Sequence, residues 1–115
     1  MKGNYVMALN PHSRTPYDPR EFYRLANKLV DDINYDQDSR NRTAIGRAYY
    51  SAFLFARKRL QDLGKGFSSD YRVHEEVITS LGEKNHLAGR HLNTLRDHRN
   101  DADYSMSADI HPQLC

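Results

Sequence analysis

The sequence has no tryptophan, a single cysteine (Cys115) and no large excess of charge of either sign. One cysteine cannot form an internal disulfide, which excludes a disulfide-stabilised secreted scaffold and favours the reducing cytoplasm. The 17 basic and 15 acidic residues give a formal net charge of +2, so any contact with nucleic acid depends on local clusters of cations. No apolar run approaches the ~18 residues of a membrane-spanning helix, and the first residues lack the apolar core of a signal peptide. We therefore expect a cytoplasmic protein that does not enter a membrane.

Glycine and proline are also scarce, with six and four residues. The chain has no glycine-rich loop of the kind that cradles phosphates and no serine or cysteine nucleophile motif. Apolar residues make up 38% of the 115 positions, which suffices for one domain with a modest core but is low for a self-sufficient globule. We expect a single domain with a large solvated surface, completed by a partner.

Apolar residues recur at helical spacing in four stretches, and no stretch of useful length alternates as a strand does. The expected helices cover residues 18–33, 39–63, 70–82 and 85–104. This pattern predicts an all-α, up-and-down four-helix bundle over residues 18–104. Residues 1–17 are predicted to form an irregular N-terminal arm, and residues 105–115 a C-terminal tail that adds little to the bundle.

Capping residues and glycines set the expected helix boundaries. Asp18-Pro19 favours the start of the first helix. The residues available as caps are, for the second helix, Asp36, Asp38 or Ser39 and, for the third, Ser68, Ser69 or Asp70. Gly64 is expected to end the second helix and Gly82 the third, and Asn85 to start the fourth.

The second helix carries two apolar surfaces. The larger one covers nearly half of the circumference and includes Tyr49 and alanines at positions 44, 48, 52 and 56, which let another helix approach closely. Tyr50 and Leu54 lie on the far side beside Arg47, and we expect this second surface to hold another copy of the chain in a homodimer. The basic residues between positions 40 and 59 are predicted to form a solvated face with a weak basic strip.

The fourth predicted helix contains the most informative residue of the chain, Arg99. At 100° per residue, Arg99 and Asp103 share a helix face with three apolar residues. These are Leu92, Leu95 and Ala102. Burying an unpaired charge is costly, so Arg99 must be paired or must face a cleft or an interface. Two interpretations follow: a structural i,i+4 pair with Asp103, or a cleft in which the guanidinium group holds a phosphate.

Arg99-Asn100, followed by a short spacer and the ring of Tyr104, resembles the Arg-Asn-(spacer)-His motif of the HEPN family (higher eukaryotes and prokaryotes nucleotide-binding). Ala102-Asp103-Tyr104 and the earlier Arg47-Ala48-Tyr49-Tyr50 resemble a bacterial and archaeal branch of small single-domain members. The likeness extends loosely from Asp18 to Tyr104. It implies a helical bundle of HEPN type.

The resemblance also implies a metal-independent endoribonuclease of toxin or defence type. In such enzymes the RNA 2′-hydroxyl attacks the adjacent phosphate, an arginine stabilises the developing charge and a histidine moves protons. By this resemblance Arg99 would stabilise the phosphate and Asn100 would orient Arg99, while Asp103 and Tyr104 would complete the catalytic site. The chain departs from the motif at Tyr104, because a phenol, with an ordinary pKa of ~10, is a poor base at neutral pH.

This departure keeps two further hypotheses open. A non-catalytic HEPN protein would bind RNA or a nucleotide, or would pair with a nucleotidyltransferase in a toxin–antitoxin module, with Tyr104 as a candidate acceptor of modification. A structural dimerisation module would use Arg99 and Asp103 only as a pair. The candidate residues for binding RNA or a nucleotide are Arg47, Tyr50 and Arg96.

The six histidines do not predict a metal site. His86, His91 and His98 share one helix at spacings that do not favour a common ion, and His74-Glu75-Glu76 lacks the second histidine of the His-Glu-x-x-His pattern. We therefore expect no metal and no cofactor. His74 matches a histidine position near the start of the third helix in the branch that the chain resembles, and the sequence assigns it no role.

Overall fold

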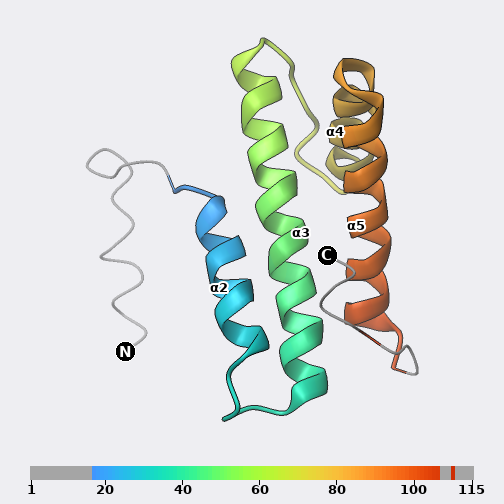
Figure 1. The fold of residues 1–115 in the computed structure, drawn as a ribbon. Helices are drawn as coiled ribbons and strands as arrows, with labels where there is room; N and C mark the ends of the chain where they lie inside the picture. The colour runs from blue at the N-terminus through green and yellow to red at the C-terminus, as the bar shows by residue number, and fades with distance from the viewer. Residues whose placement is uncertain (1–16, 107–109, 111–115) are drawn as a thin grey trace.

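The computed structural model describes residues 17–106 and residue 110, and within them the chain forms four α-helices and no strand (Figure 1). The helices are α2 (Arg20–Val30), α3 (Gln37–Asp62), α4 (Val73–Lys84) and α5 (His86–Tyr104). The predicted all-α four-helix bundle is confirmed. The predicted arm, except Tyr17, and the tail beyond Met106, except Ile110, lie outside the described residues.

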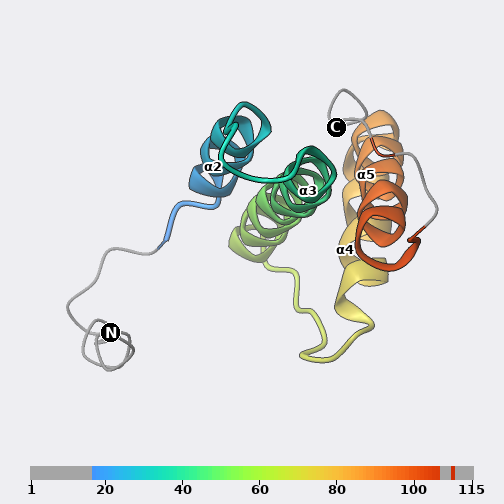
Figure 2. The same cartoon turned by 90° about the horizontal axis from the view of Figure 1, so that it is seen from below.

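The central helix of the bundle is α3 (Figure 2). α2 packs antiparallel along one side of α3. At one end the Arg20 guanidinium lies 5.8 Å from the centre of the Phe55 ring, and at the other Arg40 donates a hydrogen bond to the Val30 carbonyl at 2.7 Å. α4 and α5 pack together on the other side of α3, so residues from three helices meet there.

α4 runs in the same direction as α3. His74, at the start of α4, stacks on Phe53 in the middle of α3 with ring centres 4.4 Å apart, and Glu83 near the end of α4 pairs with Lys65, just beyond α3, at 3.8 Å. Residues 63–72 therefore turn back along α3 before α4 begins (Figure 1). The expected up-and-down order is wrong at this step, because this connection is long enough to return the chain to the middle of α3.

Local hydrogen bonds explain where α3 and α5 begin. The Asp36 carboxylate accepts a hydrogen bond from the backbone N–H of Ser39 at 2.9 Å, and the Asn85 side chain accepts one from the N–H of Ala88 at 3.0 Å. These caps satisfy N–H groups that have no partner inside the helix. Gly64 follows the end of α3 in the left-handed region, with φ of 98°. These boundaries agree with the predicted ones.

α4 departs from the prediction at both ends. It begins at Val73 with no side-chain cap, and Asp70 instead accepts a hydrogen bond from the N–H of Arg72 at 3.0 Å in the preceding turn. α4 also continues past Gly82, because the chain reverses only at the extended residue Asn85, with φ of −153°. A single residue therefore separates α4 from α5.

The main core lies where α3, α4 and α5 meet. Its buried side chains are Tyr49, Phe53, Leu60, Val77 and Leu92. The opposite side of α3 uses small residues, since Ala44 and Ala48 are buried against Ala26 of α2. The close helix approach expected from the four alanines holds for Ala44 and Ala48, whereas Ala52 and Ala56 are partly buried against the main core. The large apolar and aromatic groups are thus concentrated on the side of α3 that also faces Arg99.

Part of the C-terminal tail belongs to the core. Ile110 is buried against Ile45 and Ala102, and its carbonyl oxygen accepts a hydrogen bond from Asn41 at 3.2 Å. Arg42 donates to two backbone carbonyl groups at the C-terminal end of α5, at 2.8 and 2.9 Å. These contacts hold the end of α5 against α3. The expectation that the tail adds little is wrong, because one isoleucine in a polar segment creates no periodic pattern.

The seam between α4 and α5 predicts unequal effects of two glycine substitutions. A Cβ atom on Gly89 would lie 2.6 Å from Cα of Gly82, whereas a Cβ on Gly82 would meet no atom nearer than 3.9 Å. We expect Gly89→Ala to lower the free energy of unfolding by about 1–3 kcal/mol, and Gly82→Ala to leave it unchanged or raise it by up to about 1 kcal/mol through helix propensity. Urea unfolding followed by circular dichroism measures both. Equal effects would contradict the backbone contact.

Candidate phosphate-binding site

Arg99 of α5 points into the bundle, as its place on the apolar face predicted. Its side chain is only 12% exposed. The guanidinium carbon lies 5.2 Å from the centre of the Tyr49 ring and 5.6 Å from that of Tyr50. A cation over aromatic faces is attracted by the negative charge of the π-system, and most strongly where water is excluded. Two rings of α3 therefore hold the charge of Arg99 in place.

The charge of Arg99 is only partly balanced. Nη1 pairs with Asp103 at 3.5 Å, and the Asp103 side chain is 41% exposed. The Nε–H of Arg99 is buried and has no hydrogen-bond partner in the described part of the chain. A buried donor without a partner lowers stability, so packing alone does not explain an arginine at this position. The i,i+4 pair exists, but it leaves much of the hydrogen-bonding capacity of the guanidinium unused.

Arg96 repeats this arrangement one turn earlier in α5. Its side chain is 27% exposed, and Nη1 lies 3.6 Å from the carboxylate of Glu75 in α4. The Nε–H of Arg96 is likewise buried and unpartnered within the described residues. Because residues three apart on a helix lie on neighbouring surface positions, the two arginines form one cationic cluster at the seam between α4 and α5.

His74 of α4 completes the polar part of the site. Its Nδ1 and the Tyr49 hydroxyl are 2.6 Å apart. Burial, followed by the charges of Arg96 and Arg99, lowers the pKa of His74, and burial raises the pKa of Tyr49 to about 12. Both groups are therefore neutral near pH 7. The site combines two cations with a neutral imidazole and a neutral phenol.

An aromatic and cationic series extends from this site to α2. The Arg47 guanidinium lies 4.9 Å from the centre of the Phe22 ring and 5.1 Å from that of Tyr50. Tyr50 therefore has the guanidinium groups of both Arg47 and Arg99 close to its ring. The predicted binding residues Arg47, Tyr50 and Arg96 all lie in this connected region, which the structure assembles from α2, α3 and α5.

The four predicted catalytic residues do not all come together. Arg99 and Asp103 form the ion pair described above, and the Asp103 carboxylate lies beside Gly46 of α3. Asn100 and Tyr104 are instead exposed, Tyr104 to 72%. At about 100° per residue, both side chains project away from the rings that hold Arg99. Asn100 follows Arg96 by one turn on the outer surface of α5, whereas Tyr104 is the last residue of that helix.

Two expectations about α3 are wrong. Arg40 and Arg42 are not solvated, since Arg40 donates to a backbone carbonyl of α2 and Arg42 binds the end of α5. Tyr50 and Leu54 do not form a free second surface, because both are partly buried against the main core. Helical wheels of single helices miss these contacts, because long side chains reach over to neighbouring helices.

His74 and Tyr49 are the site residues that the sequence did not assign. Tyr49 was predicted only as a core residue, which is confirmed by its full burial. His74 stands three and four residues before Val77 and Ile78, so it occupies an apolar position of α4. A histidine at such a position is the pattern that could have indicated a partly buried, hydrogen-bonded imidazole.

The described residues contain no group of three or more His, Cys, Asp or Glu side chains placed to hold a metal ion. Over the same residues, no helix is both long and apolar enough to cross a membrane.

Comparison with known proteins gives one distant relative. The chain is 28% identical over 109 residues to the uncharacterized protein MJ0628 of Methanocaldococcus jannaschii. The match covers 80% of this chain and 66% of that protein, just under two thirds of its length. No family model matches the chain, and no solved structure matches it.

The lowered pKa of His74 predicts that stability depends on pH. Below the ordinary histidine pKa of about 6.5, the unfolded chain binds a proton at this residue before the folded chain does. The free energy of unfolding therefore falls as the pH drops below that value. His74→Gln removes this contribution, so urea unfolding at several pH values should show a steeper loss in the wild type than in the variant. Parallel curves would argue against a buried neutral imidazole.

Proposed function

We propose that the protein is a HEPN-type RNA-binding protein that holds an RNA phosphate at Arg99 and Arg96 and cleaves the bound strand without a metal ion. The observation that carries the proposal is the state of Arg99, whose nearly buried guanidinium has one partly exposed carboxylate partner and an unpartnered Nε. A positioned cation with unused donors is suited to bind phosphate. The helical bundle and the Arg99-Asn100 motif support the family assignment.

The surroundings of Arg99 favour RNA over a small anion. Guanidinium groups donate to two phosphate oxygens at once and stay charged, and two of them one turn apart suit a chain of phosphates. Tyr50 and Arg47 next to them add a partly exposed ring and a third guanidinium group that an unpaired base could contact. Single-stranded RNA, which exposes both phosphates and bases, is the ligand that matches this combination.

Cleavage would use the 2′-hydroxyl of the RNA as the nucleophile. Arg99 would stabilise the negative charge that develops on the phosphate oxygens. Asn100 and Tyr104, both exposed on α5, would donate hydrogen bonds to the strand. A second copy of the chain facing this surface would add a second Arg99, which is the homodimer that the resemblance implies.

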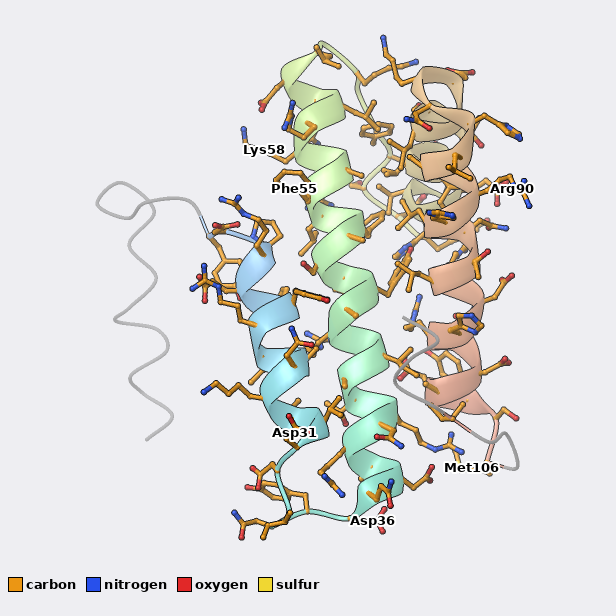
Figure 3. All side chains as sticks on the ribbon, viewed as in Figure 1. Asp31, Asp36, Phe55, Lys58, Arg90 and Met106 are labelled. Atoms are coloured by element: carbon orange, nitrogen blue, oxygen red, sulfur yellow. The ribbon has the colours of Figure 1, made fainter. Side chains whose placement is uncertain are left out.

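Arg99→Ala is expected to weaken the binding of single-stranded RNA about tenfold or more and to lower the slope of log K against log salt by about 1. Arg99→Lys should restore only part of the affinity, because an ammonium group lacks the planar fork. Fluorescence anisotropy of labelled RNA in EDTA measures both effects. Arg90→Ala is the matched control, since Arg90 is an exposed arginine on the outer side of the same helix (Figure 3).

Circular dichroism and light scattering of the same samples separate loss of binding from loss of the fold or of the dimer. A mass of one chain at tens of micromolar would contradict the dimer. If Arg99→Ala binds RNA as the wild type does, Arg99 does not hold a phosphate. The remaining hypothesis is then the structural dimerisation module. In that case Asp103→Ala and Arg99→Ala should both lower the free energy of unfolding, because each variant breaks the ion pair.

The exposure of Tyr104 favours a second candidate function, the pairing with a nucleotidyltransferase. The Tyr104 side chain is 72% exposed at the end of α5, so its hydroxyl is accessible to a modifying enzyme. In this function the protein would be a non-catalytic member of a toxin–antitoxin module. Modification would add negative phosphate charge at the end of the helix that carries Arg96 and Arg99, and this charge would repel RNA.

Co-expression with a nucleotidyltransferase encoded by a neighbouring reading frame tests this second function. We expect a gain of mass equal to whole nucleotidyl groups in the wild type and none in Tyr104→Phe, as measured by intact-protein mass spectrometry. Tyr71→Phe is the control, because Tyr71 is an exposed tyrosine far from α5 in sequence. An equal gain in Tyr104→Phe would rule out Tyr104 as the acceptor.

A further inference from the structure

RNA cleavage at the arginine cluster needs a group that takes the proton of the attacking 2′-hydroxyl. Tyr104 does not suit this step, because a phenol is a poor proton acceptor at neutral pH and its side chain projects to the outer surface. We propose that His74 of α4 accepts this proton from RNA bound at Arg96 and Arg99. The inference rests on the proposed function and names the base that the sequence motif lacks.

His74 lies beside both arginines although it comes from another helix. Its Nδ1 is 2.6 Å from the hydroxyl of Tyr49, the ring that carries the Arg99 guanidinium at 5.2 Å. The next residue in the chain, Glu75, pairs with Arg96 at 3.6 Å. The fold therefore places an imidazole, two guanidinium groups and a phenol around one point at the seam of α3, α4 and α5.

The contacts of His74 leave one ring nitrogen for a substrate. Nδ1 is occupied by the Tyr49 hydroxyl, whereas Nε2 makes no hydrogen bond to the described part of the chain and is not fully buried. When Nδ1–H donates to the Tyr49 oxygen, Nε2 holds the lone pair that accepts a proton, and the resulting imidazolium keeps the same bond. Stacking on Phe53, with ring centres 4.4 Å apart, fixes the plane of the ring.

The charges around His74 prepare it for this step. The titratable and charged groups that face it are Tyr49, Tyr50 and Arg57 of α3 and Arg96 and Arg99 of α5, while the exposed Glu75 of its own helix pairs with Arg96. Burial and the three arginines hold the imidazole in its neutral form, which is the form that accepts a proton. A phosphate bound at the arginines would offset part of their positive charge, so RNA itself would make His74 a stronger base.

The step is a balanced transesterification. The 2′-oxygen forms a bond to phosphorus while its proton passes to Nε2 of His74. The bond from phosphorus to the 5′-oxygen breaks, and the 5′-oxygen takes a proton from water. The products are a 2′,3′-cyclic phosphate and a 5′-hydroxyl, and His74 then returns its proton to solvent. Arg99 stabilises the charge on the non-bridging oxygens throughout.

The test compares wild type, His74→Ala and the control His91→Ala, which removes an exposed histidine of α5. Cleavage of labelled single-stranded RNA is followed in EDTA across a pH series, and binding of the all-2′-deoxy strand is measured in parallel. We expect His74→Ala to lower kcat about 10²–10⁴-fold with little change in binding, and to lose the acidic limb of the pH profile. Added imidazole should restore part of its activity. His91→Ala should behave as wild type.

The other possible results of this test contradict either the role of His74, RNA cleavage or RNA binding. Cleavage that persists in His74→Ala, with its pH profile intact, overturns the role of His74 and leaves the proposed function standing. A wild type that binds the deoxy strand but cleaves no RNA overturns the cleavage proposal together with His74. A wild type that binds neither strand overturns the proposed function itself. If His74→Ala fails to fold by circular dichroism, His74→Gln, which keeps a polar partner for Tyr49, replaces it with the same expected results.

Discussion

The contact of the Arg99 guanidinium with the rings of Tyr49 and Tyr50 is the interaction on which the site depends. A charge that is almost out of water has to be compensated, and here two aromatic faces and one carboxylate do so only in part. The same rings connect Arg99 to its neighbours. The Tyr49 hydroxyl is hydrogen-bonded to His74, and the Tyr50 ring contacts the Arg47 guanidinium. One buried cation thus links α5 to α3 and α4.

The contacts that hold the helices together lie apart from the residues proposed to bind RNA. α2 covers the alanine side of α3 and contributes one ring, Phe22, to the aromatic series. The tail residue Ile110 and the guanidinium of Arg42 hold the end of α5, and the glycine seam fixes α5 against α4. These supports lie away from the arginine cluster. They give the buried cation a rigid frame, which a pre-organised phosphate site requires.

Much of the fold was predictable because helices are specified by local patterns. The apolar period, the caps at Asp36 and Asn85 and the glycine after α3 gave boundaries close to the observed ones. The site was predictable where it rests on one helix: Arg99 and Asp103 are an i,i+4 pair on the inner face of α5. The partners of Arg40 and Arg42 were not, since these long side chains bind backbone groups of other segments.

By itself the sequence determined four helices, many of the apolar positions that form the core, and the presence of an arginine that had to be explained. Only the tertiary structure decided that α4 runs parallel to α3, because the return of residues 63–72 follows from packing and not from any local pattern. That direction is what brings His74 to Tyr49 and to the arginines of α5. Local propensities act over a few residues, whereas the chemistry of this site depends on side chains brought together from three helices.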